Sequence, residues 1–131
     1  MVPQAKTFSR SDAWVLTAIL TGGRDLKGII SAGDMLNHAI FSLVELNQGL
    51  SKLVNCGLVE QHGDCFHPTV SASAIYNRPK VRKANRFTQI DEILEELRCR
   101  ADTGDVPTPA FSSISQANYD QAVKSYVSSG H

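Results

Sequence analysis

The sequence predicts a single domain that is mainly α-helical and carries one small β-hairpin. Three observations lead to this prediction. Apolar residues recur at helical spacing in segments with cap signals, two short β-like runs flank a Gly-Asp pair, and a chain of 131 residues fits one core. Shares of 42% apolar and 20% charged residues are ordinary for a globular protein.

Two features of the composition bear on where the protein works. No apolar run approaches the ~20 residues that a membrane-spanning helix needs, and residues 1–10 carry scattered charge rather than an apolar leader. The three cysteines include no Cys-x-x-Cys pair, which favours reduced thiols. We therefore expect a cytoplasmic protein without a membrane partner.

The first two predicted helices are "SDAWVLTAILTGG" and "DLKGIISAGDMLNHAI". Ser11 is the expected N-cap of the first helix, which ends at Gly22-Gly23, and Asp25 is the expected N-cap of the second. A glycine inside a helix costs about 1 kcal/mol relative to alanine. We therefore expect a helix that is either bent or broken near Gly33 or, as the favoured explanation of this glycine, closely approached there by a second helix.

The third helix carries the clearest local signature. Ser42 and Glu45 fit a capping box, in which each side chain accepts a hydrogen bond from the backbone N–H of the other. Gly57 sits where a C′ glycine belongs. One apolar stripe follows the helical period: Leu43, Leu46, Leu50, Leu53 and Val54. The opposite face of this helix is polar.

The predicted hairpin consists of "LVEQH" and "CFHPT", which flank Gly63-Asp64, a two-residue connection typical of tight β-hairpins. Pro68 lacks a backbone N–H, so the second strand must end there or lie at an edge. The motif "ELNQGLSKLVNCGLVEQHGDCFHPT" resembles the winged helix-turn-helix family, and the resemblance covers about residues 11–70. This fold hosts many roles, so the resemblance is specific for the fold and not for a ligand.

The remainder of the chain is divided into a basic connector, residues 71–87, and two C-terminal helices within residues 88–131. "SASAIYN" fits a short helix or an extended run. Thr88 is the expected N-cap of "FTQIDEILEELRCR", and a loop with Pro107 and Pro109 precedes "SQANYDQAVKSYV". The two helices carry apolar stripes, namely Ile90, Ile93, Leu94 and Leu97 on one, and Tyr119, Ala122, Val123, Tyr126 and Val127 on the other.

The resemblance implies that the third helix enters the major groove of duplex DNA, where Asn and Gln can pair with adenine and Lys with guanine. The candidate base-reading residues are Asn47, Gln48, Ser51, Lys52 and Asn55. A solvated helix face is the plain alternative. Residues 25–76 hold two lysines, no arginine and five acids, a net charge of −3, which weakens the case for phosphate contacts.

A basic run directly after the hairpin could supply the missing phosphate contacts. Its five cations fall within nine residues that contain no acid: Arg78, Lys80, Arg82, Lys83 and Arg86. A solvated connector is the usual alternative for such a run. We therefore predict a DNA-binding protein and possible transcriptional regulator, with a winged-helix protein–protein interaction module as the alternative.

Metal and enzyme sites are less well supported. Cys56, His62, Cys65 and His67 are possible zinc ligands within twelve residues, but the spacing matches no known zinc finger, and the ligands would have to converge from opposite strand faces. The sequence has no Gly-rich phosphate loop, nucleophile motif or paired-carboxylate spacing. We expect no metal, no cofactor and no catalytic activity.

The two C-terminal stripes raise the question of what buries them. Each could cover the core of its own chain, or the helices could pair across a two-fold axis, because an exposed stripe of that size is an association site. The proline-containing loop would let the last helix reach outward. We predict a homodimer through the C-terminal helices.

Overall fold

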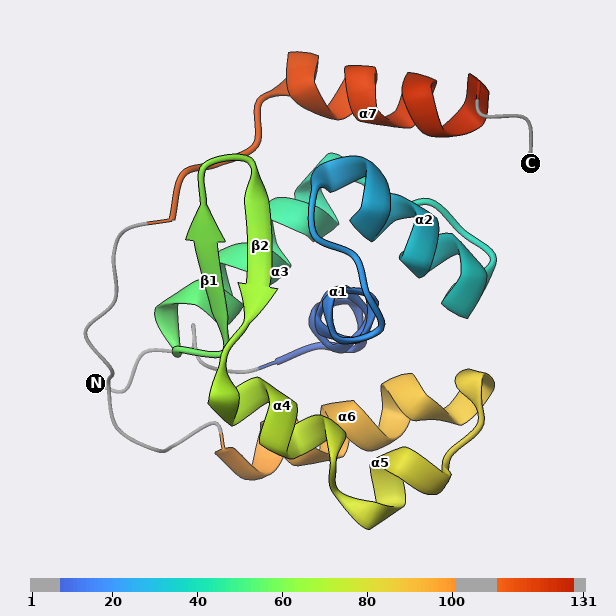
Figure 1. The fold of residues 1–131 in the computed structure, drawn as a ribbon, viewed down its shortest axis with the longest axis vertical. Helices are drawn as coiled ribbons and strands as arrows, with labels where there is room; N and C mark the ends of the chain where they lie inside the picture. The colour runs from blue at the N-terminus through green and yellow to red at the C-terminus, as the bar shows by residue number, and fades with distance from the viewer. Residues whose placement is uncertain (1–7, 101–110, 129–131) are drawn as a thin grey trace.

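The computed structural model describes residues 8–100 and 111–128. These residues form seven helices and one two-stranded antiparallel sheet, which confirms the predicted mainly helical fold with a small hairpin. The elements are, in chain order, α1 (Arg10–Leu20), α2 (Leu26–Asn37), α3 (Leu43–Asn55), β1 (Val59–His62), β2 (Cys65–Pro68), α4 (Val70–Tyr76), α5 (Pro79–Lys83), α6 (Arg86–Arg100) and α7 (Gln116–Ser128) (Figure 1).

Helix α1 is the centre of the core. It is seen end-on in Figure 1, with α2, α3 and α6 packed around it. Every residue from Asp12 to Ile19 is buried, so α1 has no solvent-facing side over two turns. A helix that is buried all round must carry small or apolar side chains in nearly every position, as "AWVLTAI" does.

Gly33 explains why α2 continues through its glycine. A Cβ built on Gly33 would lie 2.3 Å from Cε2 of Phe41, so only glycine admits that ring. Phe41 stacks against Trp14 of α1 with ring centroids 3.8 Å apart, and the Trp14 indole N–H donates to the Gly33 carbonyl over 2.9 Å. Helix α2 is therefore not broken at Gly33, and the glycine makes room for a ring from the segment between α2 and α3 rather than for a second helix.

The helix caps agree with the sequence in two of four cases. Asp25 caps α2, and Ser42 and Glu45 form the predicted capping box of α3. The N-cap of α1 is Ser9 rather than Ser11, because Ser9 forms its own capping box with Asp12. Helix α6 begins two residues before Thr88, and the Thr88 N–H donates to the Asn85 side chain over 3.0 Å.

The hairpin forms at the predicted turn, where Gly63 has a φ of +62°. Its register pairs Glu60 with His67 and His62 with Cys65. Cys65 also forms an isolated bridge with Asp25, just before α2, and the Phe66 N–H donates to the Arg24 carbonyl over 2.7 Å. The start of β2 therefore has a backbone partner on both sides, and the strand ends at Pro68.

The segment between the hairpin and α6 is more regular than expected. "SASAIYN" forms α4, which resolves the open choice between a helix and an extended run. The basic connector contains a helix, α5, which begins at Pro79 and buries Val81. Pro at the first helical position has its φ already set for a helix and loses no needed donor, so a short helix can start there.

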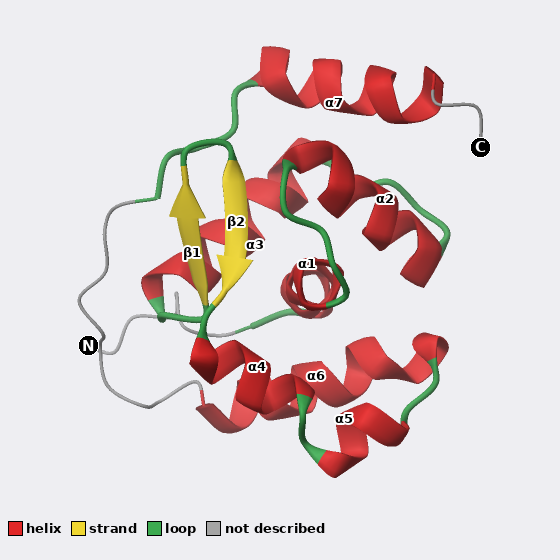
Figure 2. Ribbon diagram, in the orientation of Figure 1, coloured by secondary structure: helices red, strands yellow, loops and turns green. Residues whose placement is uncertain are grey.

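The two C-terminal helices cover their own chain. The four stripe residues of α6 (Ile90, Ile93, Leu94 and Leu97) are buried, and α6 packs on α1. Helix α7 lies against α2, on the opposite side of α1 from α6 (Figure 2), and buries Ala122 and Tyr126. Val127 is 57% exposed, which corrects its predicted place on the buried side. The α6 stripe is thus buried within its own chain and the α7 stripe only in part; Pro107 and Pro109 lie outside the described residues.

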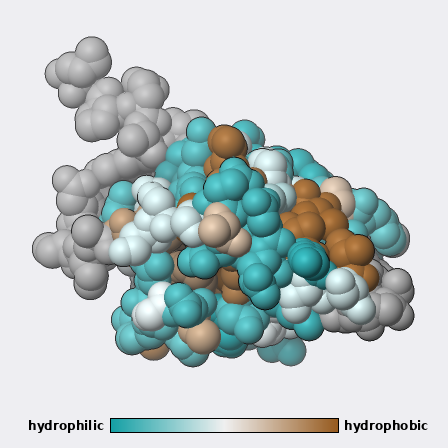
Figure 3. All heavy atoms as spheres, turned by 90° about the horizontal axis from the view of Figure 1, so that it is seen from above, coloured by the Kyte–Doolittle hydropathy of each residue, from teal (hydrophilic) through white to brown (hydrophobic). Residues whose placement is uncertain are grey.

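None of the helices in the described ranges is long and apolar enough to cross a membrane. The face seen from the α7 side is largely hydrophilic, with smaller apolar areas between (Figure 3). This agrees with an amphipathic α7 that packs on α2 and buries Ala122 and Tyr126.

Candidate binding surface on α3 and the hairpin

Helix α3 buries its apolar side and exposes only part of its predicted polar face. Leu46, Gly49, Leu50, Leu53 and Val54 are buried against the core. A Cβ on Gly49 would lie 3.0 Å from Cγ2 of Val15, so α1 and α3 approach closely there. Of the predicted base-reading residues, Gln48 and Asn55 are exposed, and Asn47, Ser51 and Lys52 are half-buried.

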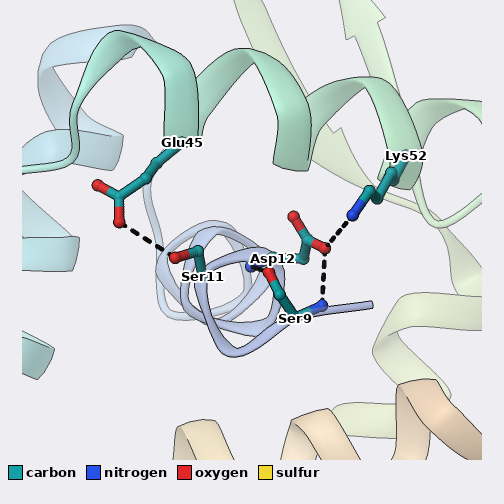
Figure 4. Close-up of polar contacts among 5 residues, drawn as sticks. All are labelled: Ser9, Ser11, Asp12, Glu45 and Lys52. Carbon is teal, nitrogen blue, oxygen red and sulfur yellow. Dashed lines mark hydrogen bonds and ion pairs between the residues drawn. The ribbon is translucent and has the colours of Figure 1, made fainter. Parts of the chain in front are cut away.

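Lys52 forms an ion pair inside the protein. Its ammonium lies 2.9 Å from Oδ2 of Asp12, whose side chain is only 2% exposed (Figure 4). The same Asp12 oxygen accepts the Ser9 N–H over 2.9 Å in the α1 capping box. A buried carboxylate needs such partners, because an uncompensated charge is costly away from water. Lys52, the cation expected to pair with guanine, is thus committed to a carboxylate of its own chain.

Glu45 is committed in the same way. One of its carboxylate oxygens accepts the Ser42 N–H over 2.9 Å in the capping box, and the other accepts the Ser11 hydroxyl over 3.1 Å (Figure 4). Charged side chains at both ends of α3 therefore contact α1. The polar groups on the exposed face of α3 are therefore mainly amides and hydroxyls.

Asn47 binds the C-terminal part of the chain. Its Nδ2 donates to the Ile114 carbonyl over 3.1 Å, and its Oδ1 accepts the Ile114 N–H over 2.8 Å. Gln61 on β1 makes the same pair of bonds with Ser112, at 3.1 Å and 2.9 Å. We call residues 111–115 the strap. Two side-chain amides, one from α3 and one from the hairpin, thus each satisfy both backbone groups of one strap residue.

Apolar contacts accompany these amide pairs. Phe111 and Ile114 are half-buried and pack against the main core. The Phe111 ring lies 6.4 Å from that of Phe66, which neighbours Gln61 across the hairpin. Gln61 and Phe66 share the inner face of the hairpin, since residues paired across two strands point to the same side. We use "α3–hairpin surface" for Asn47, Gln61 and Phe66 together.

Helix α7 continues from the strap and is anchored by two tyrosines. The Tyr119 hydroxyl donates to the Phe41 carbonyl and the Tyr126 hydroxyl to an Asp34 carboxylate oxygen, both over 2.6 Å. Burial is the main cause of the raised pKa of Tyr119, whereas the hydrogen bond to Asp34 is the main cause of the raised pKa of Tyr126. Both hydroxyls therefore serve as donors in their neutral form.

The predicted basic segment lies elsewhere. Lys80, Arg82 and Lys83 are exposed on or beside α5, and Arg78 lies 3.4 Å from a Glu96 carboxylate oxygen of α6. Helix α5 packs on α4 and α6, on the opposite side of α1 from α7 (Figure 1). The strap, by contrast, runs from the hairpin tip to α7. The backbone of Arg86 starts α6, and its side chain lies outside the described residues.

The hairpin register corrects the expected placement of the candidate zinc ligands. His62, Cys65 and His67 share the outer face of the hairpin, rather than pointing to opposite faces. The His62 and His67 rings are 5.4 Å apart, and Nε2 of His62 lies 3.2 Å from a Glu60 oxygen. Cys56 caps α3 and is half-buried. Within residues 8–100 and 111–128, no three His, Cys, Asp or Glu side chains form a group that could hold a metal ion.

Comparison of the chain with protein-family models, curated proteins and solved structures gave no match. The surface is therefore interpreted from its own geometry. Sequence reasoning selected Asn47 but missed Gln61 and the strap. The available signal was "AFSSIS", in which Phe111 and Ile114 interrupt an otherwise polar loop.

Proposed function

We propose that the protein is a winged-helix protein-interaction module whose binding site is the α3–hairpin surface. The observation that supports this most is the strap, because the surface binds the backbone of this segment through Asn47 and Gln61. Backbone pairing along an extended segment is a common way in which domains bind peptides. Apolar contacts beside such a segment add selectivity, and here the Phe111 ring of the strap lies 6.4 Å from that of Phe66.

The charge of the surface supports a protein partner over duplex DNA. Lys52 is the only Lys or Arg between residues 28 and 77, and its ammonium pairs with Asp12. The hairpin adds Glu60 and Asp64 and no cation. Phosphate neutralisation supplies nearly all non-specific DNA affinity, so a surface without available cations is a poor fit for a DNA backbone.

Duplex DNA is the second candidate, favoured by the exposed side chains of Gln48 and Asn55 on α3. Phosphate contacts would then come from Lys80, Arg82 and Lys83. A homodimer, which two-fold DNA sites would favour, also stays a prediction; light scattering at tens of micromolar chain tests it.

Selection from a random peptide library tests the proposed function on the full chain. We expect enriched peptides whose binding is lost in Asn47→Ala and Gln61→Ala and kept in Gln48→Ala, which alters an exposed amide of the same helix that makes no strap contact in the described structure. Selection is run on the wild type and on Ile114→Ser, in which the strap is weakened.

A mobility shift with random duplex DNA across a salt series provides the opposing measurement. A shift at about 50 mM salt, where phosphate contacts are strong, that is lost in Arg82→Ala/Lys83→Ala would favour the DNA alternative. Together with no peptide enrichment on either form of the chain, that shift would overturn the protein-interaction proposal.

A further inference from the structure

We infer that the α3–hairpin surface is a site for a peptide segment with an aromatic residue followed three positions later by an aliphatic one. We further infer that the strap is its resident occupant, which a partner's segment displaces. This inference rests on the proposed function and specifies the ligand and its regulation. The expected side chains of the ligand correspond to those of Phe111 and Ile114 of the strap, which occupy the site in this structure.

The hydrogen bonds between the site and the strap are made to backbone groups of the strap. Ser112 and Ile114 are two residues apart, and both turn their N–H and C=O toward amide groups of the surface. Asn47 and Gln61 therefore act as a substitute for a neighbouring β-strand, since each offers one donor and one acceptor as a paired strand residue does.

Side-chain selectivity is confined to two positions. Phe111 and Ile114 pack on the core, whereas Ser112 and Ser113 are exposed. The two central positions of a ligand can therefore vary, except that proline at the Ser112 position would remove the N–H that Gln61 accepts. The expected ligand pattern is aromatic, any, any, aliphatic, in a segment without secondary structure of its own.

The strap and α7 are separable from the main core. The two buried residues of α7, Ala122 and Tyr126, form a cluster of their own with Ile30. The contacts of Phe111, Ile114 and Tyr119 with the main core are only partly buried. The Gln61–Ser112 bonds are exposed to solvent, where competing water lowers their net contribution. A segment with few buried contacts and exposed hydrogen bonds opens at lower free energy than the core, so strap release leaves α1, α3 and α6 packed.

An attached strap has a concentration advantage over a free ligand. Because it is tethered to the same chain, its effective concentration at the site is on the order of millimolar. A free peptide of equal intrinsic affinity therefore binds the wild type weakly. It binds well once the strap's own anchors are removed, which is the behaviour of a site with a built-in competitor.

Fluorescence polarisation with a labelled synthetic peptide, Ala110–Gln116 (AFSSISQ), tests the inference on the full chain. We expect the peptide to bind Phe111→Ser/Ile114→Ser at least about tenfold more tightly than the wild type, because the tethered competitor is lost. Adding Asn47→Ala or Gln61→Ala to that variant should weaken binding about tenfold, whereas adding Gln48→Ala should not. A scrambled peptide, ASSFQIS, should not bind.

Ser112→Pro is a second strap variant that keeps both apolar anchors, for use if the double substitution fails to fold by circular dichroism. It removes one bond to Gln61 and should also raise peptide affinity. Equal affinity for the wild type and every folded strap variant, or binding that ignores Asn47 and Gln61, would overturn the inference. Library peptides that bind through Asn47 and Gln61 but lack the aromatic and aliphatic positions would also refute it while leaving the proposed function intact.

Discussion

The core around α1 and the C-terminal unit of the strap and α7 are held by different interactions. Around α1, large side chains such as Leu16, Leu50 and Ile93 are fully buried. The C-terminal unit instead depends on four amide–backbone bonds, two tyrosine hydroxyls, a small apolar cluster and the partly buried contacts of three side chains with the core. Burial is non-directional and adds up with area, whereas hydrogen bonds to partly exposed groups contribute modestly. We therefore expect the core to set global stability and the C-terminal unit to open independently.

The largest effect is expected from Leu50→Ala. Leu50 is fully buried on the α3 stripe, so truncation leaves a cavity between α3 and α1. We expect a loss of about 2–5 kcal/mol in the free energy of unfolding, measured by urea denaturation. Val44→Ala, at a 62% exposed position of the same helix, is the matched control. If Leu50→Ala lowered the free energy of unfolding by less than Val44→Ala does, the core would not set the global stability.

Lys52→Ala is expected to lower stability rather than to act only on a ligand. It leaves the buried Asp12 carboxylate without its cation, at a cost of about 1–3 kcal/mol, since Lys52 is itself partly exposed and screened. Asp12→Asn/Lys52→Met should recover part of the loss, because no charge is then stranded. If Lys52→Ala left the urea midpoint unchanged and lowered the affinity for DNA, the result would instead support the predicted base-reading role of Lys52.

Alkaline pH should loosen the C-terminal unit. The folded-state pKa values of Tyr119 and Tyr126 lie above the ordinary value of 10.0. A raised pKa means that the stabilising contribution is fully present below about pH 10 and is lost as the pH rises through the folded values. Ultraviolet absorbance of tyrosinate measures this, with Tyr119→Phe and Tyr126→Phe spectra subtracted to isolate each residue. Titration of both groups at or below pH 10.0 would refute it.

Tyr126→Phe should act locally. It removes the hydroxyl that donates to Asp34 and keeps the ring in the Ile30 cluster, so we expect a cost of about 1 kcal/mol in the opening of α7 alone. Hydrogen exchange followed by mass spectrometry should show faster exchange in residues 116–128 and unchanged exchange in α1. Faster exchange spread evenly over both regions would mean that the two open together.

Arg82→Ala/Lys83→Ala should have the smallest effect on the protein itself. Both side chains are exposed at α5, and such surface changes shift stability within about 0.5 kcal/mol. Peptide binding to the α3–hairpin surface should also be unchanged, because α5 packs on α4 and α6. Random-duplex mobility shifts on the same variant measure whether these cations contact phosphate at all.

Local signals predicted most of the fold. The capping box at Ser42, the C′ glycine at Gly57 and the turn at Gly63 each depend on neighbours within a few residues, and each is found in the structure. Errors arose where two local signals competed. Ser9 and Ser11 are both good N-cap residues, and Asp12 favours Ser9 because a capping box needs its partner three positions on.

The candidate site was only partly predictable. Periodicity placed Asn47 on the polar face of α3, but the face itself does not say what it contacts. Its partner Ile114 lies 67 residues away along the chain, and the Gln61–Ser112 pair spans 51 residues. No local rule relates a loop residue to a helix amide at such separations, so the strap was read only as a loop.

By itself the sequence determined five of the helices, the N-caps of α2 and α3 and the hairpin, since these follow from hydrogen bonds and side-chain periodicity within one or two turns. Only the tertiary structure decided which polar groups are already occupied. From the sequence, Lys52 is predicted to be an available cation, but in the folded chain it pairs with the buried Asp12. The α7 stripe is likewise predicted to be a dimer surface, and in the folded chain α2 covers part of it. Such commitments depend on contacts between distant segments, because burial removes water as the competing partner and makes an internal one necessary.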